Sequence, residues 1–307
     1  MAKKKQENDP QQLTLFAPAF PTSIAVKDQQ DLMQYPFFSL SKRKRLSPIE
    51  YDDGRVKIKV MTLHDLGMAS IFDADILVYA ASQIREAVNK GNPDPGRRLR
   101  VSRYDILNFV GKATNGKSYK QLENALDRLY GTVFKTTIRR EKNGDVFGKI
   151  KPIKWLDDYE IITKNNRPIA LEIELPQWLY DGILNDERVL TIDRAYFELE
   201  GGLERFIYRL CRKVAGETRE LQMKLETVHK RSGSPEKPGK FRKAVERVIE
   251  NQSIPGYWVF IAIRASTGDE YVCAHPKKRF KTLGQAIENT SFIAMDRALI
   301  KSGQRGL

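Results

Sequence analysis

The segment Gly111–Ser118 has the clearest potential for chemistry, because it matches the phosphate-binding pattern G-x-x-x-x-G-K-[ST]. Such a loop binds nucleotide phosphates where a buried strand precedes it and a helix follows it. Ser102 and Asp105, however, predict the start of a helix ahead of this segment. The sequence after it offers no apolar strand ending in an Asp that would hold magnesium. We therefore interpret the match as a basic turn between two helices, with a phosphate-loop ATPase as an alternative.

Other residue types that commonly do chemistry are too scattered to form a site. His64, His229 and His275 lack the spacing of a paired-histidine metal motif. Cys211 and Cys273 have neither disulfide nor metal-ligand spacing, and we expect both to be buried in a reducing compartment. We therefore predict a protein that is not an enzyme and that uses no cofactor or metal.

The charge of the chain favours a polyanionic partner. The 307 residues include 53 Lys and Arg against 39 Asp and Glu, a formal net charge of +14. Between Arg97 and Lys154 there are fifteen Lys and Arg against five Asp and Glu, and this clustering indicates nucleic-acid binding. The sequence has no apolar run of membrane-spanning length and no apolar signal core after Lys3–Lys5. We expect a cytoplasmic protein without a membrane partner.

The basic region is patterned as two helices and a hairpin. A first helix is predicted over Arg103–Lys112. A second begins at Ser118, and its apolar residues at helical spacing, which we expect to face the core, are Leu122, Ala125, Leu126 and Leu129. Val133–Arg140 and Val146–Ile153 flank Asn143–Gly144, which is a strong hairpin signal. A helix-turn-helix followed by a hairpin is a winged helix, in which the second helix enters the DNA major groove.

The second half of the chain repeats this order of elements without repeating the sequence. A helix over Leu203–Val214 precedes a helical stretch over Leu221–Lys230, which has an alternative start as a strand. A further helix follows over Lys240–Glu250, and a hairpin joins Tyr257–Arg264 to Glu270–Ala274. We predict an α+β protein with two tandem winged-helix domains.

Composition suggests where these domains begin and end. Residues 1–33 are rich in Lys, Gln, Asp and Pro, and are predicted to be a disordered tail. We assign residues 34–200 to the N-terminal winged-helix domain and 201–275 to the C-terminal one. Residues 276–307 form a basic tail with weak patterning.

Candidate DNA-binding residues lie on the outward face of each second helix and in the wings. Arg and Lys side chains suit guanine, Asn and Gln suit adenine, and Ser or Lys elsewhere suits phosphate. For each residue the alternative is an ordinary solvated helix face. The first unit offers Lys117, Tyr119, Lys120, Gln121, Asn124 and Arg128, with Arg139 and Arg140 in its wing. The second unit offers Ser232, Ser234, Lys237, Lys240, Arg242, Lys243 and Arg247.

Three groups of segments resemble the plasmid replication initiator protein A family, and the resemblance covers roughly residues 35 to 275. The middle group is the most specific, because helix periodicity does not dictate its small and polar residues. The groups are Tyr35–Lys42; Gly67–Asp73 with Asp75–Leu77 and Ser82–Gln83; and His229–Ser234 with Phe241–Arg242.

The resemblance implies a bacterial initiator without enzymatic activity that binds directly repeated sites, or iterons, in double-stranded plasmid-origin DNA. It implies that the C-terminal winged helix dominates site recognition. It also implies a monomer–dimer equilibrium, in which dimers repress their own promoter and monomers bind the repeats. Bending at adjacent repeats would help melt a neighbouring A·T-rich stretch. By analogy, the host initiator and the replicative helicase are partners. The alternative is a winged-helix transcriptional repressor without initiator activity.

A separate resemblance lies in the N-terminal tail. The segment Gln12–Phe16 resembles the bacterial peptide that binds the sliding clamp. Leu and Phe side chains of such a peptide would enter an apolar pocket, and the Gln would satisfy polar groups at its mouth. The alternative is a cluster that packs onto its own domain. The clamp-binding residues would be Gln12, Leu13, Leu15 and Phe16.

Overall fold

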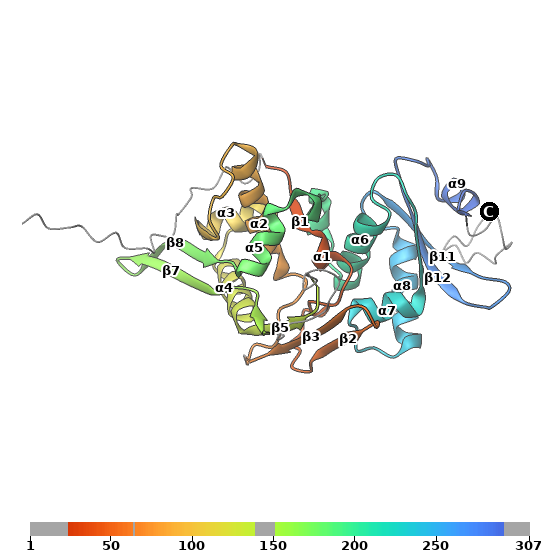
Figure 1. Ribbon diagram of the computed structural model, residues 1–307, viewed down its shortest axis with the longest axis horizontal. Helices are drawn as coiled ribbons and strands as arrows, with labels where there is room; N and C mark the ends of the chain where they lie inside the picture. The colour runs from red at the N-terminus through yellow and green to blue at the C-terminus, as the bar shows by residue number, and fades with distance from the viewer. Residues whose placement is uncertain (1–23, 64, 139–150, 292–307) are drawn as a thin grey trace, which may run out of the picture.

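A mixture of helices and antiparallel sheets makes up the computed structural model, which describes residues 24–63, 65–138 and 151–291 (Figure 1). The described residues form sheets with the strand orders β1-β9, β2-β3-β5-β6, β4-β8-β7 and β10-β12-β11. The expected mixture of helix and sheet is therefore confirmed.

The first half contains a helix, a strand, two helices and a hairpin that closes back on the strand. The strand β4 pairs with β8, and β8 pairs with β7, all antiparallel. The hairpin turns at Asn165 and Asn166, whose φ angles of 51° and 58° suit a two-residue hairpin turn. These elements are α2 (Ala74–Asn89), β4 (Arg98–Val101), α3 (Arg103–Phe109), α4 (Gly116–Gly131), β7 (Asp158–Lys164) and β8 (Arg167–Glu174).

The described residues at the base of the predicted wing belong to a different sheet from β4 and β8. Its base pairs in the expected register, because β5 (Thr132–Thr136) and β6 (Ile153–Lys154) match Val133 with Lys154. β5 also pairs with β3, so it is an inner strand of a sheet. Consecutive residues of β5 are buried, as expected for an inner strand. The hairpin that pairs with the strand before the two helices is β7–β8, whereas the tip of the predicted wing lies outside the described residues.

The sheet that contains β5 also contains two earlier strands. β2 (Ile49–Asp52) pairs with β3 (Lys57–Thr62), and β3 pairs with β5. Phe134 of β5 stacks on the buried Trp155, with ring centroids 4.2 Å apart. The segment that follows β8 contains α5 (Gln177–Leu184), η1 (Asp186–Arg188), β9 (Val189–Thr191) and η2 (Arg194–Glu198).

The second half repeats the order helix, strand, helix, helix, hairpin and the same strand pairing, without the strands β5 and β6 that lie between α4 and β7 in the first half. β10 pairs with β12, and β12 pairs with β11, so the hairpin again closes on the strand before two helices. The stretch at Leu221 therefore begins as a strand. The elements are α6 (Gly202–Val214), β10 (Leu221–Lys224), α7 (Leu225–Ser232), α8 (Pro238–Asn251), β11 (Tyr257–Ile263) and β12 (Glu270–Pro276), followed by α9 (Leu283–Glu288).

Regular structure begins before the predicted end of the N-terminal tail. β1 (Lys27–Gln29) pairs with β9, and α1 (Gln30–Met33) follows it directly. Ile24, Val26 and Leu32 are buried in the core. The prediction of a disordered segment up to residue 33 is therefore wrong from residue 24 onward, because these few apolar side chains outweigh the polar composition around them.

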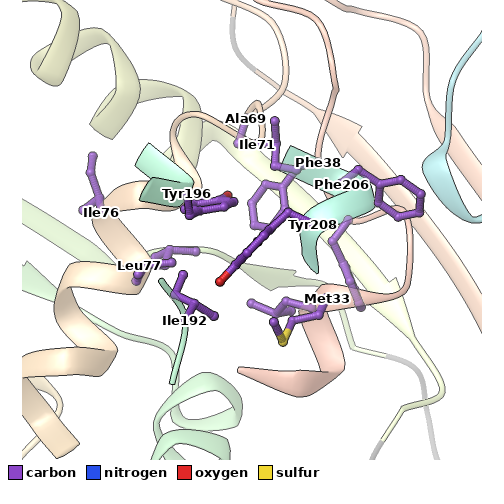
Figure 2. Packing of buried hydrophobic residues seen from close by; sticks show 14 of the residues in the cluster. Met33, Phe38, Ala69, Ile71, Ile76, Leu77, Ile192, Tyr196, Phe206 and Tyr208 are labelled. Carbon is purple, nitrogen blue, oxygen red and sulfur yellow. The ribbon is translucent and has the colours of Figure 1, made fainter. Parts of the chain in front are cut away.

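The two halves share one apolar core, and α6 lies between them (Figure 1). Figure 2 shows Met33 of α1, Phe38, Tyr196 of η2 and Tyr208 of α6 gathered in this region. The rings of Tyr196 and Tyr208 have centroids 5.5 Å apart. The hairpins β7–β8 and β11–β12 lie toward opposite ends of the long axis in Figure 1.

Candidate nucleic-acid interface

Helix α4 follows a turn that caps its first residues. Asn115 accepts a hydrogen bond from the amide of Ser118 at 3.0 Å, so the helix begins at Gly116, two residues before the predicted start. Helix α3 precedes this turn, which confirms that Gly111–Ser118 joins two helices. The predicted core stripe is confirmed as well, since Leu122, Ala125, Leu126 and Leu129 are buried.

The outward residues of α4 differ in how far they are available to a ligand. Lys117, Lys120 and Gln121 are exposed, and Lys120 lies 3.6 Å from Glu123 in a solvated ion pair. Tyr119 is half-buried beneath the guanidinium of Arg103. Asn124 is also half-buried, and with Gln121 it lines a cavity of about 510 Å³ between α2, α3, α4 and α6. Lys117, Lys120 and Gln121 are therefore the solvent-exposed predicted contacts on this helix.

Arg128, predicted to contact DNA, makes a different contact. Its guanidinium donates to both carboxylate oxygens of Asp73, with Nε–Oδ2 and Nη2–Oδ1 distances of 2.8 and 2.6 Å. The hydrogen bonds to Asp73 raise the pKa of Arg128 above its ordinary value. This pairing uses one edge of the guanidinium, two of its five N–H donors, so Arg128 has a structural role within the protein and its contact with DNA stays a prediction.

Much of the positive charge between Arg97 and Lys154 is neutralised within the protein. Arg97 of the first half lies 2.5 Å from Glu174, and Arg98 lies 3.1 Å from Glu172. Both glutamates lie on β8, paired across the sheet with β4. The excess of basic residues counted in the sequence therefore overstates the charge that this region offers to a polyanion.

The hairpin β7–β8 is attached to α4, and it projects from one end of the molecule (Figure 1). The Tyr159 hydroxyl of β7 donates to the Asp127 carboxylate of α4, and burial together with this bond raises the pKa of Tyr159. The Tyr130 and Tyr159 rings lie edge to face, with centroids 5.8 Å apart. Lys164, exposed beside the turn, was absent from the predicted contacts, although the Asn165–Asn166 pair signals the hairpin.

Helix α8 carries the more accessible basic face. Phe241, Val245 and Val248 are buried against the core of the second half. On the opposite side, Lys240, Lys243 and Arg247 follow one another at intervals of three and four residues, and all are exposed. Lys237, at the N-terminal cap position, is exposed too, and Ser234 lies half-buried in the preceding turn. Four of the predicted contacts therefore lie on one solvent-facing stripe.

Two predicted contacts of the second half are engaged within the protein. Arg242 donates to both oxygens of Glu270 at 2.8 and 2.9 Å and to Glu246 at 2.7 Å, which raises its pKa. Ser232 is 1% exposed, and its hydroxyl donates to the carbonyl of His229. Both side chains therefore organise the turn and the helix, and their contact with DNA stays a prediction.

The remaining predicted residues lie outside the part of the chain that the structure describes. These are Arg139 and Arg140 of the predicted wing and the clamp-binding residues Gln12, Leu13, Leu15 and Phe16. Among the described residues, no helix combines the length and the apolar composition that crossing a bilayer requires.

Comparisons with known proteins agree with one another. The family model for replication initiator protein A matches residues 27–259. A protein of Wigglesworthia glossinidia brevipalpis named "Putative replication protein" is 30% identical over 230 residues, which are 73% of this chain and 81% of that protein.

The fold is similar to that of RctB domains 2 and 3. A crystal structure of selenomethionine derivatives of these domains has a TM-score of 0.57 at 14% identity, covering 78% of this chain and 94% of that one. A second crystal structure of domains 2–3 of RctB has a TM-score of 0.52 at 12% identity, covering 85% and 100%.

Proposed function

The chain belongs to the replication initiator protein A family, and we propose that it is a plasmid initiator that binds directly repeated origin DNA through two winged-helix units. One observation carries the proposal. The order helix, strand, helix, helix, hairpin occurs twice, and each time the second hairpin strand pairs with the strand before the two helices. In this arrangement α4 and α8 are the second helices, and both expose lysines to solvent.

Within this proposal the hairpins β7–β8 and β11–β12 are the wings. Residues 34–200 and 201–275 are the two units, and α8 contributes most of the specificity. Its exposed stripe of Lys240, Lys243 and Arg247 combines groups that can bind phosphate with groups that can bind guanine. Helix α4 adds Lys117 and Lys120 from the first unit.

We propose that binding at adjacent repeats initiates replication without nucleotide hydrolysis. Bending of the duplex at several neighbouring sites would load strain onto an A·T-rich stretch, where base steps unstack most easily. The free energy of DNA binding would then drive melting, so the protein would act without enzymatic activity, cofactor or metal.

The proposal includes partners in the bacterial cytoplasm. The segment Gln12–Phe16 would bind the sliding clamp, and other surfaces would contact the host initiator and the replicative helicase. A monomer–dimer equilibrium would separate binding at the origin repeats from repression of the promoter. These partners are supported by the family and by the N-terminal sequence motif.

Capture of sheared replicon DNA by the full-length protein, followed by sequencing and footprinting, tests the proposal. Tandem direct repeats beside an A·T-rich segment are the expected result. A lone inverted repeat over a promoter would identify a transcriptional repressor instead. Absence of any enriched sequence would overturn DNA recognition by α4 and α8.

A further inference from the structure

Helix α6 begins the second half, but two of its arginines are buried in the first half. Arg205 donates from Nη1 to Oδ1 of Asp75 at 2.6 Å, and the two side chains are 3% and 4% exposed. The guanidinium also donates to the carbonyls of Leu199 and Phe197. A buried guanidinium with this many directed bonds allows one orientation of the helix that carries it.

A second ion pair lies one helical turn further along α6. Arg209 donates from Nε and Nη2 to the two carboxylate oxygens of Asp28, at 2.7 and 2.9 Å. Asp28 belongs to β1, whereas Asp75 belongs to α2, so the two pairs attach α6 to separate elements of the first half. Two buried pairs on separate elements restrict rotation of the second half as well as its separation from the first.

Close backbone contact reinforces this junction. A Cβ atom on Gly202, the first residue of α6, would lie 1.9 Å from the carbonyl oxygen of Leu40. Farther along the junction, Arg45 donates from Nη1 to the carbonyl of Gly233 at 2.6 Å. Because the neighbouring atom is a backbone oxygen of Leu40, no change of side-chain rotamer can make room for a Cβ atom on Gly202.

We infer that Gly202, Arg205 and Arg209 are positioning residues that fix the rotational phase between the two DNA-binding helices. The protein then distinguishes its sites by the spacing between two half-sites as well as by their sequences. This inference rests on the proposed function, since it requires that α4 and α8 both contact DNA. A protein with flexibly joined units would bind sites of different spacing with similar affinity. A rigid protein would have to bend or twist the DNA to reach both half-sites, and this deformation would reduce its affinity.

Binding titrations with spacing variants test the inference. One added base pair between the two footprinted half-sites turns one against the other by about 35°. The full-length wild-type protein should lose affinity by about tenfold or more on this insertion. Gly202→Ala should bind the natural site less tightly, but the same insertion should change its affinity by no more than about threefold.

A matched glycine variant provides the control. Gly284 also lies in the first turn of a helix, and a Cβ there would meet only Thr282 Oγ1, at 3.9 Å. Gly284→Ala should therefore keep the wild-type penalty for the inserted base pair. If Gly202→Ala fails to fold, Arg45→Gln replaces it, with the exposed neighbour Arg43→Gln as the control for lost charge.

The possible outcomes distinguish failure of the inference from failure of the proposed function. Equal affinity of the wild-type protein for natural and lengthened sites would overturn the inference that the rotational phase between α4 and α8 is fixed. An unchanged spacing penalty in Gly202→Ala, or in Arg45→Gln, would overturn the role of the junction. Absence of any specific site would instead contradict the proposed function.

Discussion

Arg128 of α4 and Asp73 at the start of α2 form a pair with two hydrogen bonds, of 2.6 and 2.8 Å. Asp73 also accepts hydrogen bonds from the amide and the hydroxyl of Ser70, so its carboxylate is surrounded by donors. The pair therefore attaches the proposed DNA-binding helix to the N-terminal end of α2 in the same unit. It stabilises the position of α4, and it directs two of the five N–H donors of Arg128 at Asp73.

Replacement of Arg128 should reduce stability more than it changes DNA specificity. Arg128→Ala leaves the Asp73 carboxylate, 5% exposed, without its charged partner, so the free energy of unfolding should fall by about 1–3 kcal/mol. Urea denaturation measures this change. Lys120→Ala is the control, because this exposed residue should affect affinity for DNA but not unfolding. An Arg128→Ala protein of unchanged stability and relaxed base preference would instead identify Arg128 as a base contact.

Lys243 and Arg247 on α8 should contribute directly to DNA affinity. Arg247→Ala should cost about 1–3 kcal/mol of binding and relax specificity at one position if the side chain contacts a base. Lys243→Ala should weaken binding to all sequences and reduce the salt dependence if it contacts phosphate. Asn124→Ala on α4 should also cost about 1–3 kcal/mol if this half-buried amide reaches an adenine. Anisotropy titrations at several salt concentrations distinguish these effects.

Arg242→Ala provides the comparison on the same helix. It removes the same charge as Arg247→Ala, but its partners are Glu270 and Glu246, so stability should fall instead of base specificity. An affinity that does not depend on salt in the wild-type protein would contradict an electrostatic contribution from the α8 stripe.

The sequence was sufficient for those features that depend on local spacing. The apolar spacing from Leu122 to Leu129 predicts the buried face of α4. The Ser102 hydroxyl oxygen accepts a hydrogen bond from the amide of Asp105, as the capping pattern predicts. Asn165–Asn166 is also a local hairpin signal, but the local sequence does not show that this hairpin closes on β4. Local propensity identifies hairpins, but which strand each one pairs with depends on distant residues.

The partners of the arginines could not be predicted in the same way. Arg128 pairs with Asp73, 55 residues away, and Arg209 pairs with Asp28, 181 residues away. The sequence of a helix does not show whether an arginine on its polar face has an ion-pair partner elsewhere in the protein. Only the tertiary fold separates Arg128 and Arg242, which hold the protein together, from Lys243 and Arg247, which face solvent.

The buried pair between Arg209 and Asp28 gives a prediction about folding. Arg209→Met alone would leave a buried carboxylate without its partner, so the free energy of unfolding should fall by about 3–5 kcal/mol. The double variant Asp28→Leu/Arg209→Met should recover much of this loss, since no unpaired charge remains. Denaturation of both variants by urea measures the difference. A double variant as unstable as the single one would show that the charge pair is not the origin of the loss.

The N-terminal segment gives a prediction that is independent of the DNA-binding helices. Replacing both Leu15 and Phe16 with Ala should abolish capture of the bacterial sliding clamp, because these side chains would fill its apolar pocket. Binding to origin DNA should remain at the wild-type level in the same protein. Clamp capture that survives both substitutions would eliminate this segment as the binding motif.

His275 of β12 gives the fold a dependence on pH. Its Nε2 lies 2.8 Å from Thr290 Oγ1 and 3.3 Å from Glu220 Oε2, and the side chain is buried. Burial lowers the pKa of His275 from its ordinary 6.5, although Glu220 acts in the opposite direction. Because the pKa of His275 is lower in the folded chain than in the unfolded chain, protonation of this side chain favours unfolding. Its contribution to stability is therefore complete above about pH 6.5 and is lost as the pH falls through the folded pKa.

The thermal midpoint should therefore fall between about pH 7.5 and 5 in the wild-type protein and fall less in His275→Gln. Glutamine retains a polar group that can reach Thr290, but it has no proton to gain in this range. The difference should correspond to about 1 kcal/mol for each unit by which the folded pKa is lowered. Other titrating groups are common to both proteins, so identical pH profiles would show that His275 does not titrate on unfolding.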